Sequence, residues 1–355
     1  MSENLQPSGA AGSATFAGSD SRRYNYYTPE GKRATLYEDV TVDVQPDPSR
    51  HLLQGWIMSF ADGTPSYSEK STAIKSSDWH AFRAPDQEWS RTHYQRQSHI
   101  ENTIKMVVDN ARGDGAPGRF DQGWVGVLQN QFGALKHAEF GLGVALMKAQ
   151  RDGMTQMINN TILTNASYKL RLAQDITLYL GDIGLDISID GEAGKQVWLN
   201  DPAWQGVRKA VEAILAANDH LEIYFAVNVV FEALVGELFR SGFIMRAGPV
   251  HNDFVTPAVV SAAASDYRQN LANTVTLIGQ LTGDPTHGAA NKKIMQGWLA
   301  RYVPLCAQAA RDLRGIWSLQ DNGDLQYDVI AEESRARFKD ILVAVQLNLP
   351  ADVSL

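Results

Sequence analysis

The chain lacks three features that would place it in familiar classes of protein. Its one cysteine, Cys306, excludes an internal disulfide framework and any cysteine-based zinc site within one chain. The longest apolar run, residues 223–231, is interrupted by Asn228 and is less than half of the roughly 20 residues that span a bilayer. The first twenty residues are small and polar, without the basic start and apolar stretch of a secretory signal. We therefore expect a soluble, cytoplasmic protein with no membrane partner.

Basic residues are also fewer than acidic ones. The 355 residues include 32 Lys and Arg against 40 Asp and Glu, which gives a net charge of -8. A protein that neutralises phosphates needs clustered basic groups, so nucleic acid is not an expected partner. The apolar content, 44%, is enough to fill a large core and excludes a wholly disordered or fibrous chain.

Helical patterns dominate the chain from residue 119 onward. Apolar residues recur every three or four positions over 124–145, and Asp201-Pro202 is a helix-start signal. Residues 221–238 are apolar almost all round, which is typical of a helix buried inside a larger helical assembly. Other helices are expected near 86–110, around 172–183, and over 256–282, 289–319 and 327–346. No strand–helix alternation is present, so we predict an all-α fold with a single helical domain over residues 51–355.

Residues 1–50 read as an extended N-terminal arm, since they lack helical periodicity. Within them, residues 40–44 alternate like a short strand or an extended segment. Tyrosine and arginine, which are enriched at protein interfaces, cluster earlier in the arm. The residues predicted to contact a partner are Arg22, Arg23, Tyr24, Tyr26 and Tyr27. The alternative is a strand that covers its own domain.

Searches for catalytic patterns return nothing that predicts a site. The glycines at 113, 115 and 118 match GxGxxG, but they follow a polar helix and so indicate a loop. A di-iron site in a helical bundle needs Glu-x-x-His on two helices. The one acid three residues before a histidine is Asp284, ahead of His287, and it lies between two glycines in a predicted loop.

Other acidic residues near histidines are interpreted as polar groups in solvent or at interfaces. Asp219 and His220 would point about 100° apart on a helix, so they form no dyad. The same interpretation covers Glu222, Glu139 beside His137, and Glu232 with Glu237. Glu222 and Glu232 lie too far apart along one helix to share a metal, so each is expected to be solvated, paired with a basic group or hydrogen-bonded in the bundle. No catalytic, cofactor-binding or metal-ligating residue is predicted in this chain.

Four short segments together carry a family likeness. They are residues 37–40 (YEDV), 77–79 (SDW), 82–85 (FRAP, with Trp89 after it) and 173–179 (AQDITLY). In this order they resemble the small (beta) hydroxylase subunit of soluble bacterial multicomponent di-iron monooxygenases. The resemblance is greatest to the propane 2-monooxygenase type, and it extends over nearly the whole chain after about residue 22.

The resemblance implies a ferritin-like, ribonucleotide-reductase-like bundle without metal ligands. A large (alpha) hydroxylase subunit would hold the di-iron centre in an α2β2 assembly. A coupling protein and a reductase with FAD and an iron–sulfur cluster would supply electrons from NADH. The complex would insert one oxygen atom of O2 into propane or a similar small hydrocarbon. Residues 174–178 would correspond to the large subunit's metal-binding motif, with Leu178 where a ligand is wanted.

Three hypotheses therefore remain at the level of sequence. The first is a non-catalytic structural subunit of such a hydroxylase. The second is a stand-alone helical ligand-binding or regulatory protein, which would bind a small molecule without a partner. The third is an enzyme with an unrecognised site of its own, which would turn over substrate as a single chain.

Overall fold

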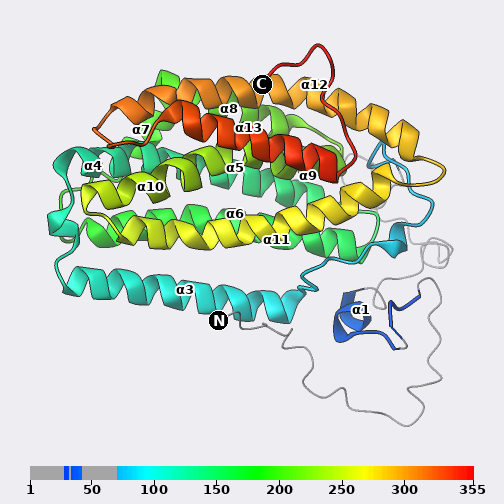
Figure 1. The fold of residues 1–355 in the computed structure, drawn as a ribbon. Helices are drawn as coiled ribbons and strands as arrows, with labels where there is room; N and C mark the ends of the chain where they lie inside the picture. Colours follow the sequence, from blue (N-terminus) through cyan, green and yellow to red (C-terminus); the bar gives the residue numbers. More distant parts are fainter. Residues whose placement is uncertain (1–27, 32, 42–69) are drawn as a thin grey trace, which may run out of the picture.

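The structure is a computed structural model that describes residues 28–31, 33–41 and 70–355. All the regular elements in these ranges are helical, as Figure 1 shows. The long helices run roughly side by side in stacked layers. This confirms the predicted all-α fold.

The bundle at the centre is a ring of four helices. Its members are α5 (Gly133–Gln150), α6 (Gln156–Ile183), α11 (Val255–Thr282) and a long central helix over residues 220–247. Each packs against its two neighbours, α5 on α6, α6 on α11, α11 on the central helix and the central helix on α5. Side chains that point inward from all four can therefore meet.

The central helix is built from four consecutive segments. These are α9 (His220–Phe225), two π-helical stretches (Ala226–Gly236 and Leu238–Ile244) and α10 (Met245–Ala247). Every residue from His220 to Arg240 is buried. The all-round apolar pattern thus correctly predicts a helix enclosed by others.

Further helices cover this bundle on its outer sides. On one side lie α8 (Pro202–Ala216), α12 (Gly288–Asp312) and α13 (Tyr327–Ala344), and α3 (Ser90–Gly113) runs along the opposite side (Figure 1). Asp201 caps α8 as its Asp-Pro sequence predicts, since its side chain accepts from the Ala203 N–H. The shorter helices are α4 (Gln122–Val127), α7 (Ala193–Asn200), a π turn (Leu128–Phe132) and 3-10 turns at Trp79–Ala81, Pro117–Arg119, Gly248–His251 and Leu313–Ser318.

A short helix, α1 (Leu36–Thr41), lies in the segment expected to be an extended arm. It is formed by a capping box, because the Thr35 hydroxyl accepts from the Glu38 N–H while the Glu38 carboxylate accepts from the Thr35 N–H. Arg83 then pairs with the buried Glu38 at 2.8 Å and ties α1 to the domain. The strand interpretation of residues 40–44 is therefore wrong at Val40 and Thr41, and residues 42–44 lie outside the described ranges.

Two other findings complete the fold. None of the described helices is both long enough and apolar enough to cross a membrane. Cys306 is completely buried within α12, and burial raises the pKa of its thiol.

Candidate functional site

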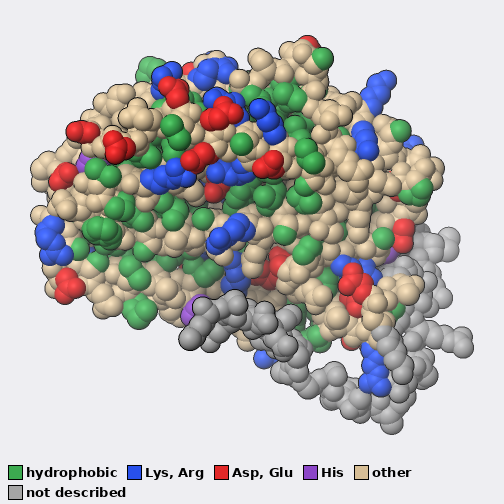
Figure 2. All heavy atoms as spheres, viewed as in Figure 1, with side chains coloured by type: hydrophobic (Ala, Val, Ile, Leu, Met, Phe, Trp, Pro, Cys, Tyr) green, Lys and Arg blue, Asp and Glu red, His purple; other side chains and the backbone are tan. Residues whose placement is uncertain are grey.

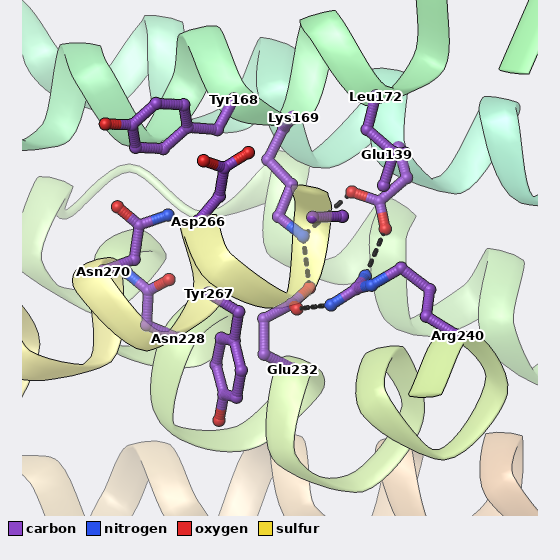
Figure 3. A pocket seen from close by; sticks show the side chains of 11 residues that line it. Glu139, Tyr168, Lys169, Leu172, Asn228, Glu232, Arg240, Asp266, Tyr267 and Asn270 are labelled. Carbon is purple, nitrogen blue, oxygen red and sulfur yellow. Dashed lines mark hydrogen bonds and ion pairs between the residues drawn. The ribbon is translucent and has the colours of Figure 1, made fainter. Parts of the chain in front are cut away.

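Five charged residues meet in the middle of the four-helix ring, and we call them the core cluster. They are Glu139, Lys169, Glu232, Glu237 and Arg240. Figure 3 shows four of them, Glu139, Lys169, Glu232 and Arg240, converging from α5, α6 and the central helix, with α11 closing the remaining side. All five are less than a tenth exposed.

The two cations are shared among the three carboxylates. The Lys169 ammonium lies 2.8 Å from Glu139 Oε2 and also donates to Glu232 Oε1. Arg240 donates from Nη1 to Glu139 Oε1, and from Nη2 to Glu232 Oε2 and, at 3.0 Å, to Glu237 Oε1. The second oxygen of Glu237 accepts from the Ser241 hydroxyl at 2.7 Å.

Burial and charge oppose each other in this cluster, and charge prevails. Burial alone would raise the pKa of Glu232, but the neighbouring Arg240 and Lys169 lower that pKa to about 2. Burial would likewise lower the pKa of Arg240, yet the surrounding glutamates hold it well above its ordinary value. Glu232 and Arg240 are therefore ionised at neutral pH, as a stable buried ion pair requires.

Gly236 makes room for these contacts. A Cβ at this position would lie 2.9 Å from both carboxylate oxygens of Glu232 and 3.0 Å from Arg240 Nη1. Atoms do not approach a real Cβ so closely, so the absence of a side chain here lets the carboxylate and the guanidinium sit against the helix backbone.

A cavity of about 10 Å³ borders the core cluster. That is about the space of a single water molecule, which requires roughly 10–15 Å³ by this measure. Apart from cluster members, its lining includes Leu172, Asn228, Asp266, Tyr267 and Asn270 (Figure 3). The lining contains no histidine.

Asp266 belongs to a second polar network, which joins α3 to the bundle. It accepts from Arg171 and, at 2.6 Å, from Arg96. Arg96 also stacks over the Tyr168 ring, and the Tyr168 hydroxyl donates to the buried Glu88. The carboxylate of Asp266 is thus already occupied by two guanidinium groups.

The sequence interpretation of Glu139 and Glu237 as solvated or interfacial groups is wrong, whereas Glu232 is paired with basic groups, one of the arrangements expected for it. All three are buried and paired in the core cluster. Sequence periodicity shows which residues face inward but not which residues on other helices they meet. Lys169 and Arg240, which complete the cluster, were not singled out from the sequence.

The residues near the start of the central helix have separate hydrogen-bond partners. Asp219 caps the helix by accepting from the Leu221 and Glu222 N–H groups, as expected of a polar residue at a helix start. His220 is buried, with Nδ1 3.2 Å from the Ser71 carbonyl oxygen, and Glu222 accepts from Arg301 and Tyr302.

The structure also locates the acid-x-x-His sequence at Asp284 and the expected ligand position at Leu178. Asp284 accepts from the backbone N–H groups of Thr286 and His287, and the acid-x-x-His sequence lies in the loop before α12, as predicted. The interpretation of Leu178 as a former ligand position is wrong, because its side chain is 56% exposed while Leu172 of the same helix faces the cavity. The predicted contact residues Arg22, Arg23, Tyr24, Tyr26 and Tyr27 lie outside the described ranges.

The outer face of α5 and α6, opposite the core cluster, is unusual for a protein surface. The exposed residues of α5 are Phe140, Val144 and Met147, which share one side of the helix. On α6, Leu163 and Leu178 are exposed with a few uncharged polar residues. The charged residues of the two helices are buried, apart from Lys136, Lys148 and Asp182, which are half-buried.

A different kind of surface lies over α12 and α13. There Figure 2 shows basic and acidic side chains interleaved. The ion pairs include Arg246 with Glu333 and Arg335 with Glu332. Charge depletion is therefore a property of the α5–α6 face and not of the whole molecule.

Comparison with known proteins identifies the family. The family model described as methane/phenol/alkene hydroxylase matches residues 56–285. The chain belongs to this hydroxylase family. A small subunit of the hydroxylase component of propane 2-monooxygenase from Rhodococcus jostii is 41% identical over 97% of this chain and 94% of its own. The methane monooxygenase component A beta chain of Methylosinus trichosporium is 28% identical over 84% of this chain and 78% of its own.

Solved structures of hydroxylases share the fold. A chain of phenol hydroxylase from Pseudomonas sp. OX1 aligns with a TM-score of 0.75 at 17% identity, covering 94% of this chain and all of that one. A chain of toluene 4-monooxygenase aligns with a TM-score of 0.71. These matches confirm the resemblance noted in the sequence. The chain is a small subunit of the hydroxylase component of a multicomponent monooxygenase.

The residues at the core of this hydroxylase subunit do not fit a di-iron pair. Every carboxylate beside the cavity already accepts from lysine or arginine. In the described part of the chain, no group of three or more His, Cys, Asp or Glu is arranged to hold a metal ion.

Proposed function

We propose that this chain is a non-catalytic, structural subunit of a hydroxylase that inserts one atom of O2 into propane or a similar small hydrocarbon. The observation that carries the proposal is the core cluster. In a helical bundle of this kind, the space among the four helices is where a di-iron site would be built. Here that space is filled by the chain's own lysine and arginine.

The size of the core cavity supports a structural role over the stand-alone alternative. Ligand pockets are typically roughly 300–1,000 Å³ and mostly apolar. The cavity beside the core cluster has about 10 Å³ and a charged lining. A helical ligand-binding protein would need a pocket that this core does not offer.

The partner in this proposal is the large hydroxylase subunit, in an α2β2 assembly that holds the di-iron centre in the large chains. The largely apolar outer face of α5 and α6 is the contact surface, because interface cores are depleted in charge and enriched in aromatic side chains and methionine. The N-terminal residues Arg22 to Tyr27 add a second contact. A coupling protein and an NADH-dependent reductase with FAD and an iron–sulfur cluster complete the cytoplasmic system.

Co-expression of this chain with the large subunit tests the assembly. The variant Val144→Asp places a charge at the middle of the α5 stripe and should reduce the recovered complex at least tenfold. Val343→Asp is the matched control, since Val343 is 76% exposed on α13 and its substitution should leave the yield unchanged. Equal yields from both variants would remove the α5–α6 face from the interface.

Turnover measurements test the division of labour. The complete set of components should oxidise propane with NADH, and omission of either hydroxylase subunit should abolish activity. Oxidation of hydrocarbon by this chain with the reductase alone would contradict the structural role. Saturable binding of a small molecule by the isolated chain would favour the second hypothesis.

A further inference from the structure

The contacts inside the core cluster form a closed ring. Each of two carboxylates, Glu139 and Glu232, uses one oxygen for Lys169 and its other oxygen for Arg240. The two carboxylates come from different helices, α5 and the central helix. Each carboxylate therefore bridges Lys169 and Arg240, and the two cations lie between the same two acids.

The helical positions match those of a metal pair. Carboxylate-bridged metal sites in bundles take a Glu from each of two helices and residues three apart from each of the other two. Glu139 and Glu232 supply the first two. On α6 the residues three apart that line the cavity are Lys169 and Leu172. On α11 there are two such pairs, Ala263 with Asp266 and Tyr267 with Asn270. Acidic residues thus occupy the single-Glu positions on two helices. The paired positions offer no imidazole, and their one carboxylate, Asp266, is already paired with Arg171 and Arg96.

We propose that Lys169 and Arg240 are resident cations that replace a metal pair in a carboxylate-bridged site. Buried carboxylates need compensating positive charge, which metal ions would otherwise provide. With the charge supplied by side chains, this subunit folds around the site without metal. The inference concerns this chain alone and does not depend on the proposed contact with the large subunit.

The first test measures charge balance in the full-length chain. Lys169→Met removes the cation but keeps most of its volume, and it should lower the melting temperature by roughly 5–15 °C. Glu139→Gln together with Lys169→Met removes one cation and one bridging charge, and should recover at least half of that loss. Leu172→Met, a neutral change at the neighbouring cavity position, is the control and should shift the melting temperature by no more than roughly 5 °C.

The second test asks whether the vacated position takes up an added cation. Lys169→Ala leaves space between Glu139 and Glu232, and millimolar MnCl2 or propylammonium chloride should raise its melting temperature. Sodium chloride at equal ionic strength should not. The wild-type chain and the Glu139→Gln/Lys169→Ala double variant should gain nothing from either cation.

Two outcomes would overturn the proposal. One is a Glu139→Gln/Lys169→Met chain that is no more stable than Lys169→Met, or that also fails to fold where Lys169→Met fails. The other is a Lys169→Ala chain that gains no stability from either cation beyond the effect of salt. Either outcome would mean that Lys169 only forms an ion pair and does not take the place of a metal ion.

Discussion

The two faces of the α5–α6 helix pair are inverted relative to an ordinary surface helix. The inner face carries charged side chains, among them Glu139 and Lys169, both buried. The outer face exposes apolar side chains such as Phe140 and Leu178. Charges inside a protein are stable only when paired, and apolar groups outside are stable only when covered. The inner face should therefore govern folding, and the outer face should govern assembly.

The largest expected effect comes from removing a charge on the inner side. Arg240→Met leaves three buried carboxylates with one cation, and should reduce the free energy of unfolding by about 3–5 kcal/mol. The control is Arg246→Met on the same helix, where a half-exposed pair with Glu333 contributes at most about 1 kcal/mol. Denaturant unfolding curves compare the two. Similar losses would mean that the inner charges are no more tightly coupled than surface ones.

The pH dependence of stability tests another buried ion pair of α6, Asp175 with Arg171, which lies outside the core cluster. Burial raises the pKa of Asp175 to about 6, although Arg171 beside it acts in the opposite direction. Because the folded state holds this proton more tightly than the unfolded chain, its stabilising contribution is full below about pH 4 and is lost as the pH rises to about 6. The stability of the wild type relative to Asp175→Asn should fall across this window, by at most about 3 kcal/mol. A rise across the same window would show that Arg171 dominates instead.

A substitution at Gly236 tests whether the core cluster needs the space that the missing side chain leaves. Gly236→Ala forces Glu232 and Arg240 apart and should cost about 1–3 kcal/mol. Gly297→Ala in α12 is the matched control, since its Cβ would meet nothing within 4 Å. That variant should be stabilised by up to about 1 kcal/mol, because alanine is the better helix former. Thermal unfolding of the two variants should therefore shift in opposite directions.

The smallest effect is expected at Glu222, where the charge lies near the edge of the bundle. Its partner Arg301 is 61% exposed, so water can solvate the guanidinium when the carboxylate is removed. Glu222→Gln should lower the free energy of unfolding by at most about 1 kcal/mol, and turnover per di-iron centre in the assembled hydroxylase should stay within about twofold. A hundredfold loss of turnover with intact assembly and full iron content would place this subunit in the chemistry.

Most of the long helices of this chain can be predicted from its sequence. The predicted span 256–282 agrees with α11 within one residue, because its limits follow from local periodicity and breakers. The N-terminal helix α1 was missed although Thr35 and Glu38 have capping-box spacing, since a six-residue helix gives almost no periodic signal.

The core cluster was not predicted because its members are far apart in the chain. Glu139 and Arg240 are separated by 101 positions, and no local pattern pairs them. One signal was nevertheless available. Arg240 and Glu232 interrupt a segment that is otherwise apolar on every side, and buried charges in such a helix require partners. Lys169 is an inward-facing cation on the neighbouring helix α6 and supplies such a partner to Glu232.

The buried position of Cys306 turns the chain into its own unfolding reporter. As the one thiol in 355 residues, completely enclosed in α12, it can react with an alkylating reagent only when the bundle opens. Its rate of modification therefore measures the free energy of opening without any introduced probe. A cysteine placed on the α5–α6 face would, for the same reason, be the single reactive thiol of the native chain and could map by cross-linking what lies against it.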